Sequence, residues 1–289
     1  MRRLRNITGA TVGLEACKGM KTRILAAVVL VPLLFVIVLA APKIIFAILF
    51  GVLMAVGVYE MLYRTALVAH PRLVAYSAVM AFGLAMWSYF GAVNAYLLLA
   101  LCLFFMLLFS EILRDHVKVR VEMLGMCFLA GFVVPFLLSS LIRILGVPAG
   151  RYYILVPFLI AFLSDAGAYF AGMYLGRHKL APVISPNKTV EGVVGGVIFA
   201  VLAMMIYGGV LALGFKLDVH FGVVFLYGLA GSLIGVFGDL CFSAIKRQTG
   251  IKDYGYLIPG HGGFFDRFDS MVLVAPFLEA MLMLLPFAE

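Results

Sequence analysis

The sequence predicts an all-α protein that crosses a membrane many times. Hydrophobic residues make up 65% of its 289 positions and charged residues only 12%, and its mean hydropathy is +1.14. A water-soluble domain has about half its residues apolar and about a quarter charged, so this chain has more apolar side chains than a soluble core needs. The apolar residues form long runs, and most cationic residues lie between alternate runs. These observations indicate a lipid bilayer as the solvent.

Nine apolar runs are long enough to form transmembrane helices, because about 20 helical residues cross a hydrocarbon core. In chain order they are Ile24–Ala41, Ile44–Tyr63, Leu73–Phe90, Ala95–Leu113, Val121–Leu145, Tyr152–Gly176, Val193–Phe215, Phe221–Phe242 and Met271–Ala288. Only Pro42 and Lys43 separate the first two runs, which predicts a tight hairpin. Pro135 interrupts the fifth run and Asp165 the sixth.

The distribution of Lys and Arg predicts a cytosolic N-terminus and an external C-terminus. In this orientation 18 of the 22 cationic residues are cytosolic, six in the N-terminal tail and twelve in loops. The four external ones are Lys43, Arg143, Arg151 and Lys216. Cytosolic loops of membrane proteins carry such an excess. Topology therefore explains most of the net charge of +8, which is also compatible with attraction of anionic lipid or nucleotide.

The chain divides into three parts. Residues 1–23 form a polar cytosolic tail that we expect to be disordered, with Met20 as an alternative start. Residues 24–150 form an N-terminal transmembrane half of five helices. Residues 151–289 form a second half of four helices and two cytosolic loops, and most of the polar residues that could do chemistry lie there. We therefore expect the second half to be catalytic.

Polar residues at helix ends of the first half have ordinary structural explanations. Glu60 and Arg64 lie one turn apart, which favours a structural ion pair or an arginine that extends to the membrane surface. A second group at a helix end is expected to be solvated: Glu111, Arg114, Asp115 and His116. Glycines four residues apart predict close helix packing at Gly172/Gly176, Gly192/Gly196 and Gly231/Gly235.

In the second half, polar groups concentrate in residues 164–192 and 238–269. The candidate site residues of the first segment are Asp165, Ser185, Lys188 and Thr189. Those of the second segment are Asp239, Ser243, Lys246, Arg247, Lys252, Asp253, His261, Gly262, Gly263, Asp266, Arg267 and Asp269.

Asp165 lies deep in its apolar run. Eleven residues separate it from Gly176, which corresponds to ~16 Å of helix and places it near the bilayer centre. An ionisable group there costs about 2.5–3.5 kcal/mol and usually faces a polar cavity with a partner. A functional role is therefore favoured over a packing aspartate that hydrogen-bonds to Ser or Tyr neighbours.

The second segment combines acids and bases in a way that suits phosphate chemistry. Asp239 lies near a cytosolic helix end, and Asp266 and Asp269 precede the last apolar run. Carboxylate oxygens suit Mg²⁺, which keeps waters and substrate phosphates as its other ligands. The same segment supplies four cations: Lys246, Arg247, Lys252 and Arg267. Together they are typical of phosphoryl or nucleotidyl transfer, although a positive loop with balancing acids is the structural alternative.

Other chemistries lack support in the sequence. The four cysteines, Cys17, Cys102, Cys127 and Cys241, do not have disulfide or metal-site spacing. The chain has no Ser-His-Asp arrangement and no His-Glu-x-x-His motif. Its basic loop lacks the interleaved aromatic residues expected for binding nucleic acid, so we expect no nucleic-acid partner.

Several motifs resemble those of a known family. The 27 residues Ser243–Asp269 contain Ser-x-Ile-Lys-Arg, Lys-Asp, Leu-Ile-Pro-Gly-His-Gly-Gly and Asp-Arg-x-Asp, and resemble the signature of phosphatidate cytidylyltransferases (CDP-diacylglycerol synthases). Upstream, Ser164-Asp165-x-Gly-Ala-Tyr, Lys179-Leu-Ala-Pro182 and Ser185-Pro-x-Lys-Thr189 are also similar. The resemblance covers about Tyr152–Ser270, and the first five runs agree only in hydrophobicity and number. Phe242 and Val190 depart from the acidic residue and the Trp of many relatives.

The resemblance implies a Mg²⁺-dependent reaction of CTP with phosphatidate that gives CDP-diacylglycerol and pyrophosphate. It leaves open whether a second, monovalent cation joins the Mg²⁺. It also implies a multi-pass homodimer among the lipids of the plasma (bacterial inner) membrane. By resemblance, the metal pair is Asp239 and Asp266. The phosphate or transition-state partners are Lys188, Lys246, Arg247, Lys252 and Arg267. The residues that complete the polar cavity are Asp165, Asp253, His261 and Asp269. The remaining substrate-binding residues are Ser185, Thr189, Ser243, Gly262 and Gly263.

Two alternatives from other classes remain. One is a transporter that uses Asp165 for ion coupling, although the sequence shows no evident repeat. The other is a relative that uses CTP to phosphorylate a polyprenol or to charge an ether lipid. The intact run His261–Asp269 disfavours the polyprenol kinase, and these residues do not distinguish acyl from ether chains.

Overall fold

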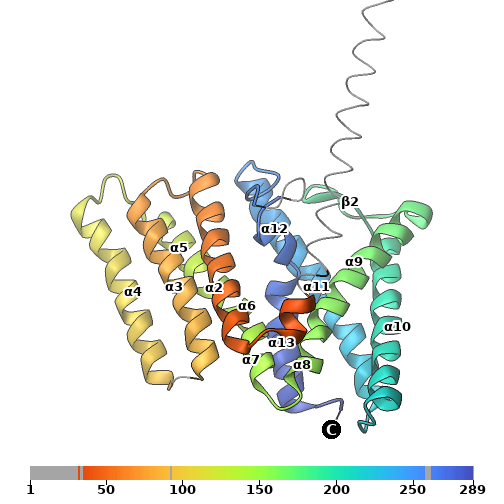
Figure 1. Ribbon diagram of the computed structural model, residues 1–289. Coiled ribbons are helices and arrows are strands. Elements are labelled where there is room, and N and C mark those ends of the chain that lie inside the picture. The colour runs from red at the N-terminus through yellow and green to blue at the C-terminus, as the bar shows by residue number, and fades with distance from the viewer. Residues whose placement is uncertain (1–31, 33–34, 92, 258–261, 289) are drawn as a thin grey trace, which may run out of the picture.

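The computed structural model describes residues 32, 35–91, 93–257 and 262–288, and these are almost entirely helical (Figure 1). The predicted tail 1–23 and most of the first predicted span lie outside the described residues. The helices of the first half are α2 (Lys43–Tyr59), η1 (Glu60–Arg64), α3 (Pro71–Phe90), α4 (Asn94–Arg114), α5 (Val121–Phe128), η2 (Leu129–Val133), α6 (Val134–Leu138) and α7 (Ser140–Gly146). The second half contains α8 (Gly150–Tyr153), α9 (Leu155–Leu175), strands β1 (Lys179–Ala181) and β2 (Ser185–Thr189), α10 (Val190–Gly214), α11 (Phe221–Gln248), α12 (Phe265–Phe268) and α13 (Met271–Leu284).

Seven helical segments in the described part of the chain are long and apolar enough to cross a membrane. They are Lys43–Arg64, Pro71–Phe90, Asn94–Arg114, Val121–Gly146, Gly150–Leu175, Val190–Gly214 and Phe221–Gln248. Each corresponds to one of the nine predicted runs, which confirms an all-α, multi-pass membrane protein. The count of nine itself is not confirmed.

The last predicted span is shorter than the sequence suggested. Helix α13 has 14 residues, or ~21 Å of helix, against a hydrocarbon core of about 30 Å. It ends at Leu284 because the residue before a proline, here Leu285 before Pro286, is disfavoured in helical conformation. The following residues turn back, and Ala288 forms a bridge with Val219, two residues before α11 begins.

The fifth predicted run, which Pro135 interrupts, departs from a regular α-helix near this residue. The π-helical turn η2 ends two residues before it, and Pro135 is in the first turn of α6. A proline inside a helix has no N–H to donate, and its ring clashes with the carbonyl four residues earlier, so the helix rearranges locally. In this π-helical turn Gly131 lies against the backbone of Ser77 in α3, leaving no space for a side chain.

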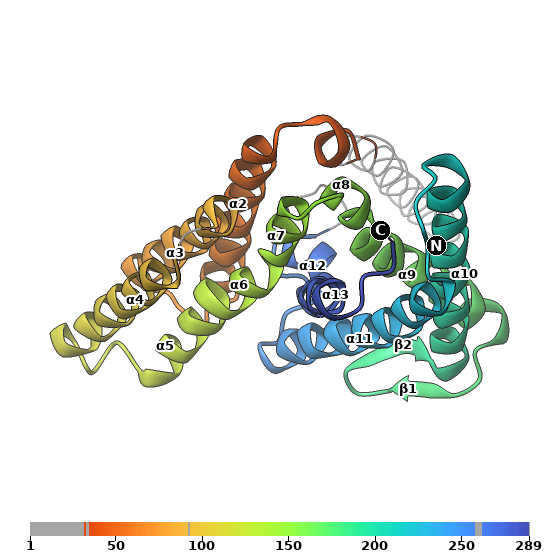
Figure 2. The same ribbon diagram turned by 90° about the horizontal axis from the view of Figure 1, so that it is seen from below.

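The two halves lie side by side, with α13 between them (Figures 1 and 2). Helices α2–α7 form one group and α9–α11 the other. Helix α13 contacts α6 and α7 on one side and α9 and α11 on the other, and its residues Val272, Val274, Ala275 and Leu278 are buried. The short helix α13 thus lies at the centre of the bundle.

Small residues allow α9 and α10 to approach closely, as the glycine spacing predicts. A Cβ atom on Gly192 would lie 2.9 Å from the carbonyl oxygen of Ala168, and one on Gly196 would lie 2.7 Å from that of Ser164. Both distances are shorter than van der Waals contact. The glycines therefore fix the position of α10 relative to Asp165, which follows Ser164 in α9.

One end of the bundle carries the polar loops. The segment after η1, the α4–α5 loop, the β1–β2 hairpin and the segment between α11 and α13 all lie there (Figure 1). The hairpin pairs Lys179 with Thr189 and Ala181 with Ser185, and the sequence did not predict it.

The expectation that Glu111 is solvated is wrong, because this residue is only 2% exposed. Its carboxylate accepts hydrogen bonds from the Tyr76 hydroxyl and from Arg114.

Candidate active site

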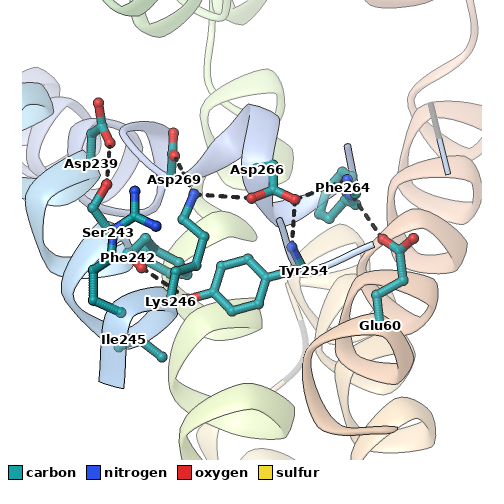
Figure 3. A network of polar contacts seen from close by, with 12 residues as sticks. Glu60, Asp239, Phe242, Ser243, Ile245, Lys246, Tyr254, Phe264, Asp266 and Asp269 are labelled. Atoms are coloured by element: carbon teal, nitrogen blue, oxygen red, sulfur yellow. Dashed lines mark hydrogen bonds and ion pairs between the residues drawn. The ribbon is translucent and has the colours of Figure 1, made fainter. Parts of the chain in front are cut away.

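Helix α11 extends past the predicted end of its apolar run and carries several candidate residues on one face. It continues for six residues beyond Phe242, so Ser243, Lys246 and Arg247 are helical rather than part of a loop. Asp239, Ser243 and Lys246 are spaced by four and three residues, which places them on one side of the helix. The Ser243 hydroxyl donates to Asp239 Oδ1 at 3.1 Å (Figure 3).

Asp266 is the most enclosed carboxylate of the cluster, with a side chain only 1% exposed. Its Oδ2 accepts hydrogen bonds from the backbone N–H groups of Tyr254 at 2.7 Å and Gly263 at 2.9 Å. Its Oδ1 accepts from Lys246 Nζ at 3.0 Å. Asp266 therefore connects Tyr254 and Gly263, on either side of the undescribed residues 258–261, and links both to α11.

Lys246 lies between two carboxylates (Figure 3). Besides its bond to Asp266, its Nζ lies 3.8 Å from Asp269 Oδ2. It also lies 5.5 Å from the ring centroid of Tyr254, within the range of a cation–π contact. Burial raises the pKa of Asp269, the nearby charges of Asp239 and Asp165 raise it further, and Lys246 opposes this shift. Asp165, Asp239 and Asp269 thus belong to one electrostatic cluster.

The β1–β2 hairpin brings a second lysine to the same cluster. Lys188 in β2 forms an ion pair with Asp239, and both side chains are about a quarter exposed. Arg247 Nε donates to the backbone carbonyl of Ile184 in the hairpin turn, at 3.0 Å. The hairpin is therefore fixed to α11 at two positions. Its other end is fixed by Thr189, whose side chain accepts from the Gly192 N–H and caps α10.

Asp165 lies in the middle of α9 and its side chain is exposed. It interacts electrostatically with Asp239, Lys188 and Arg267. The carboxylate expected deep in the bilayer is therefore near the polar cluster. Helix α9 is continuous through this position, from Leu155 to Leu175.

The remaining candidates are less constrained. Lys252, Asp253 and Arg267 are exposed at the same end of the bundle, and Ser185 is half-buried in β2. Gly262 has a φ of +90°, a conformation that favours glycine, and Gly263 donates its N–H to Asp266. His261 lies outside the described residues.

The oxygen donors of the cluster suit a magnesium ion that also binds a substrate. In the described ranges, no three His, Cys, Asp or Glu side chains lie close enough to hold a metal by themselves. Mg²⁺ commonly takes one or two carboxylates and fills its other positions with water and phosphate oxygens. Asp239 fits this pattern, since its carboxylate is partly exposed and its partners are Ser243 and Lys188. Asp266 could contribute only Oδ1, in place of its bond to Lys246.

Glu60 is a residue of this site that the sequence reasoning missed. It is buried, and its carboxylate accepts hydrogen bonds from the backbone N–H groups of Tyr256, Leu257 and Phe264. The ion pair with Arg64, one of the two expectations for it, is not formed between these two described residues. Arg64 instead lies over the ring of Tyr256, at 5.0 Å from its centroid. The sequence signal that could have indicated Glu60 is an acidic residue at the end of an apolar run.

Sequence comparison places these observations in a family. The Cytidylyltransferase family matches residues 21–285. Phosphatidate cytidylyltransferases of Staphylococcus aureus, Staphylococcus epidermidis and Staphylococcus saprophyticus are similar, with 47%, 44% and 45% identity over 135, 133 and 136 residues. Each alignment covers 46% of this chain and 50% of the relative, so the chain spans about half the length of the curated relatives it matches. Because the family match extends over most of the chain, this protein belongs to the cytidylyltransferase family.

Proposed function

We propose that this protein transfers CMP from CTP to phosphatidate at the cytosolic face of a bacterial plasma membrane, giving CDP-diacylglycerol and pyrophosphate. One observation carries the proposal: Lys188 and Lys246 converge with Asp239, Asp266 and Asp269 at one end of a membrane-spanning bundle. A site that joins a lipid to a cytosolic polyanion needs both this location and this mixture of charges. The names of the staphylococcal relatives support the same reaction.

In the proposed reaction an oxygen of the phosphatidate phosphate forms a bond to the α-phosphorus of CTP. The bond from that phosphorus to the oxygen bridging to the β-phosphorus breaks, and pyrophosphate leaves. The phosphatidate phosphate is already an anion, so the reaction needs no strong general base. The main barrier is the approach of two polyanions, which fixed positive charges lower.

The chain's own residues would hold and orient the two substrates. Lys188, Lys246 and Arg247 would bind phosphate oxygens, the two lysines by exchanging carboxylate partners for phosphate. Exposed Lys252 and Arg267 would add charge for the departing pyrophosphate. A Mg²⁺ ion held by Asp239 and Asp266 would neutralise charge on the nucleotide phosphates when bound. Asp165 would line the route between the lipid and Asp239. We also expect a homodimer, as in the family that the motifs resemble.

The position of the label in the product tests the reaction. Purified protein in detergent with phosphatidate and Mg²⁺ should move the α-phosphate label of CTP into lipid and release pyrophosphate in equal amount. CTP labelled at the γ-phosphate should leave the lipid unlabelled. A CTP-dependent lipid kinase would give the opposite pattern, and a transporter would label no lipid at all. Label from the γ-phosphate in the lipid fraction would overturn the proposal.

The proposal also requires the polar end of the bundle to face the cytosol. Lys216 and Lys252 are both exposed and lie at opposite ends of the bundle. Lys216 precedes α11, and Lys252 follows it. Single cysteines at these positions, in a background without other cysteines, should react differently with a membrane-impermeant thiol reagent in intact cells. Position 216 should be labelled, and position 252 only after the cells are opened. External labelling at position 252 would show that the orientation is inverted and that the site faces away from cytosolic CTP.

A further inference from the structure

The carboxylate of Glu60 binds backbone N–H groups of the loop between α11 and α12, of which the structure describes residues 249–257 and 262–264. Its Oε1 accepts from Tyr256 at 2.9 Å and Leu257 at 3.0 Å. Its Oε2 accepts from Phe264 at 3.0 Å. The donors lie 196, 197 and 204 residues away in the sequence. Successive backbone N–H groups of this kind form an anion-binding nest, and here the anion is a side chain of the first half.

The loop is shaped to fit this carboxylate. A Cβ on Gly255 would collide with Glu60, and one on Gly263 would lie 2.5 Å from Glu60 Oε2. Glycine is therefore needed at both positions for close approach rather than for chain flexibility. Gly57, one turn before Glu60, similarly leaves room for the ring of Phe264.

Two carboxylates hold the loop from opposite sides (Figure 3). Glu60 binds the N–H groups of residues 256, 257 and 264, and Asp266 binds those of residues 254 and 263. Asp266 in turn contacts Lys246, and Arg267 is its neighbour in the chain. The two carboxylates thus bind the neighbouring N–H groups of Gly263 and Phe264, which connects Glu60 through the loop to Asp266 and α11.

We propose that Glu60 is a positioning residue that fixes the described parts of this loop, residues 254–257 and 262–264, together with Asp266, in the geometry that binds the nucleotide phosphates and their metal. The proposal rests on the proposed function, since it assigns Asp266 and Arg267 to CTP rather than to the lipid. The π-helical turn η1 contributes to this positioning. It places both Glu60 and Arg64 against the loop, one on its backbone and the other on the ring of Tyr256. Such π turns frequently occur at functional sites.

The variant Glu60→Gln tests the role of the carboxylate with little change of shape. An amide can keep one oxygen for two N–H groups, but its NH₂ group would face the third N–H, donor against donor. We expect the apparent KM for CTP and the Mg²⁺ concentration for half-activity to rise about 10- to 100-fold, as for other groups that orient metal ligands. The KM for phosphatidate should stay unchanged. A purely structural role would reduce the active fraction, and therefore kcat, without moving either KM.

The matched control is Glu111→Gln. Glu111 is also a buried carboxylate at the polar end, but its partners are the side chains of Tyr76, Arg114 and Arg72 rather than the loop. This variant should alter stability without changing the KM for CTP. If Glu60→Gln does not yield folded protein, Gly255→Ala should produce the same rise in KM, because it displaces the loop and leaves the charge in place.

Hydrogen exchange provides a readout that needs no activity. In the wild type, the amides of Tyr256, Leu257 and Phe264 should be protected although they lie outside regular helices and strands, and Glu60→Gln should expose them. Unprotected amides in the wild type, or an unchanged KM for CTP in an active Glu60→Gln enzyme, would overturn the proposal. If the wild-type amides are protected but the protein transfers no CMP, the proposed reaction is wrong, whereas the contact between Glu60 and the loop is confirmed.

Discussion

Replacement of Asp239 by asparagine is expected to reduce CMP transfer by roughly a thousandfold, because a metal ligand contributes several kcal/mol to the transition state. Asparagine has the same shape but no charge, and can still accept from Ser243, its partner in α11. Lys188 loses its ion pair but is about a quarter exposed, so it can be solvated. The protein should therefore insert and unfold in detergent much as the wild type does. Initial rates over a Mg²⁺ titration, together with thermal unfolding, measure the two effects separately.

Asp115→Asn is the matched control for this variant. Asp115 lies at the same end of the bundle and pairs with Lys118, but it is remote from α11 in the chain and lies in the α4–α5 loop. Its replacement should leave turnover unchanged. An Asp239→Asn enzyme that keeps more than about a tenth of the wild-type rate at saturating Mg²⁺ would lose too little transition-state stabilisation for a metal ligand. Asp239 would then not be one of the two metal ligands.

The membrane-spanning part of the fold could be read from the sequence because a bilayer permits few alternatives. Backbone groups in hydrocarbon must be paired within the helix, so a long apolar run has one stable structure. The predicted run Ala95–Leu113 and the observed α4, Asn94–Arg114, differ by one residue at each end. The extension of α11 to Gln248 was missed because the sequence there changes from apolar to charged without changing its helical conformation.

The arrangement of the candidate site was less predictable than its composition. The motifs identified Lys246 and Asp266, but the spacing could not indicate that they bind one another 20 residues apart. Glu60 was assigned to its nearest charged neighbour, Arg64, since local pairs are the only ones visible in a sequence. Its actual partners are backbone N–H groups, which every non-proline residue has and which no pattern of side chains reveals. Tertiary packing of the two halves decides such contacts.

The second large effect is expected at the buried pair of Asp266 and Lys246. Removal of one partner of a buried ion pair leaves an uncompensated charge, which costs about 3 kcal/mol or more. Asp266→Asn places an amide NH₂ group against the Lys246 ammonium or against the two backbone N–H groups, and every orientation opposes donor to donor. We therefore expect Asp266→Asn to lower the thermal unfolding temperature clearly as well as to abolish CMP transfer, in contrast to Asp239→Asn.

A double variant separates the structural contribution of the pair from its chemical one. In Asp266→Asn combined with Lys246→Met, the unpaired ammonium is gone and the side-chain stem is retained, and the remaining change is that Asp269 loses a more distant cation, 3.8 Å away. We expect this variant to recover most of the lost stability and none of the turnover, because the carboxylate and the ammonium that we propose to act on the metal and the phosphates are both absent. Thermal unfolding of the wild type, both single variants and the double variant gives the coupling energy of the pair directly. If the double variant is no more stable than Asp266→Asn, the ion pair does not hold the loop to α11, and the backbone hydrogen bonds to Asp266 carry that role instead.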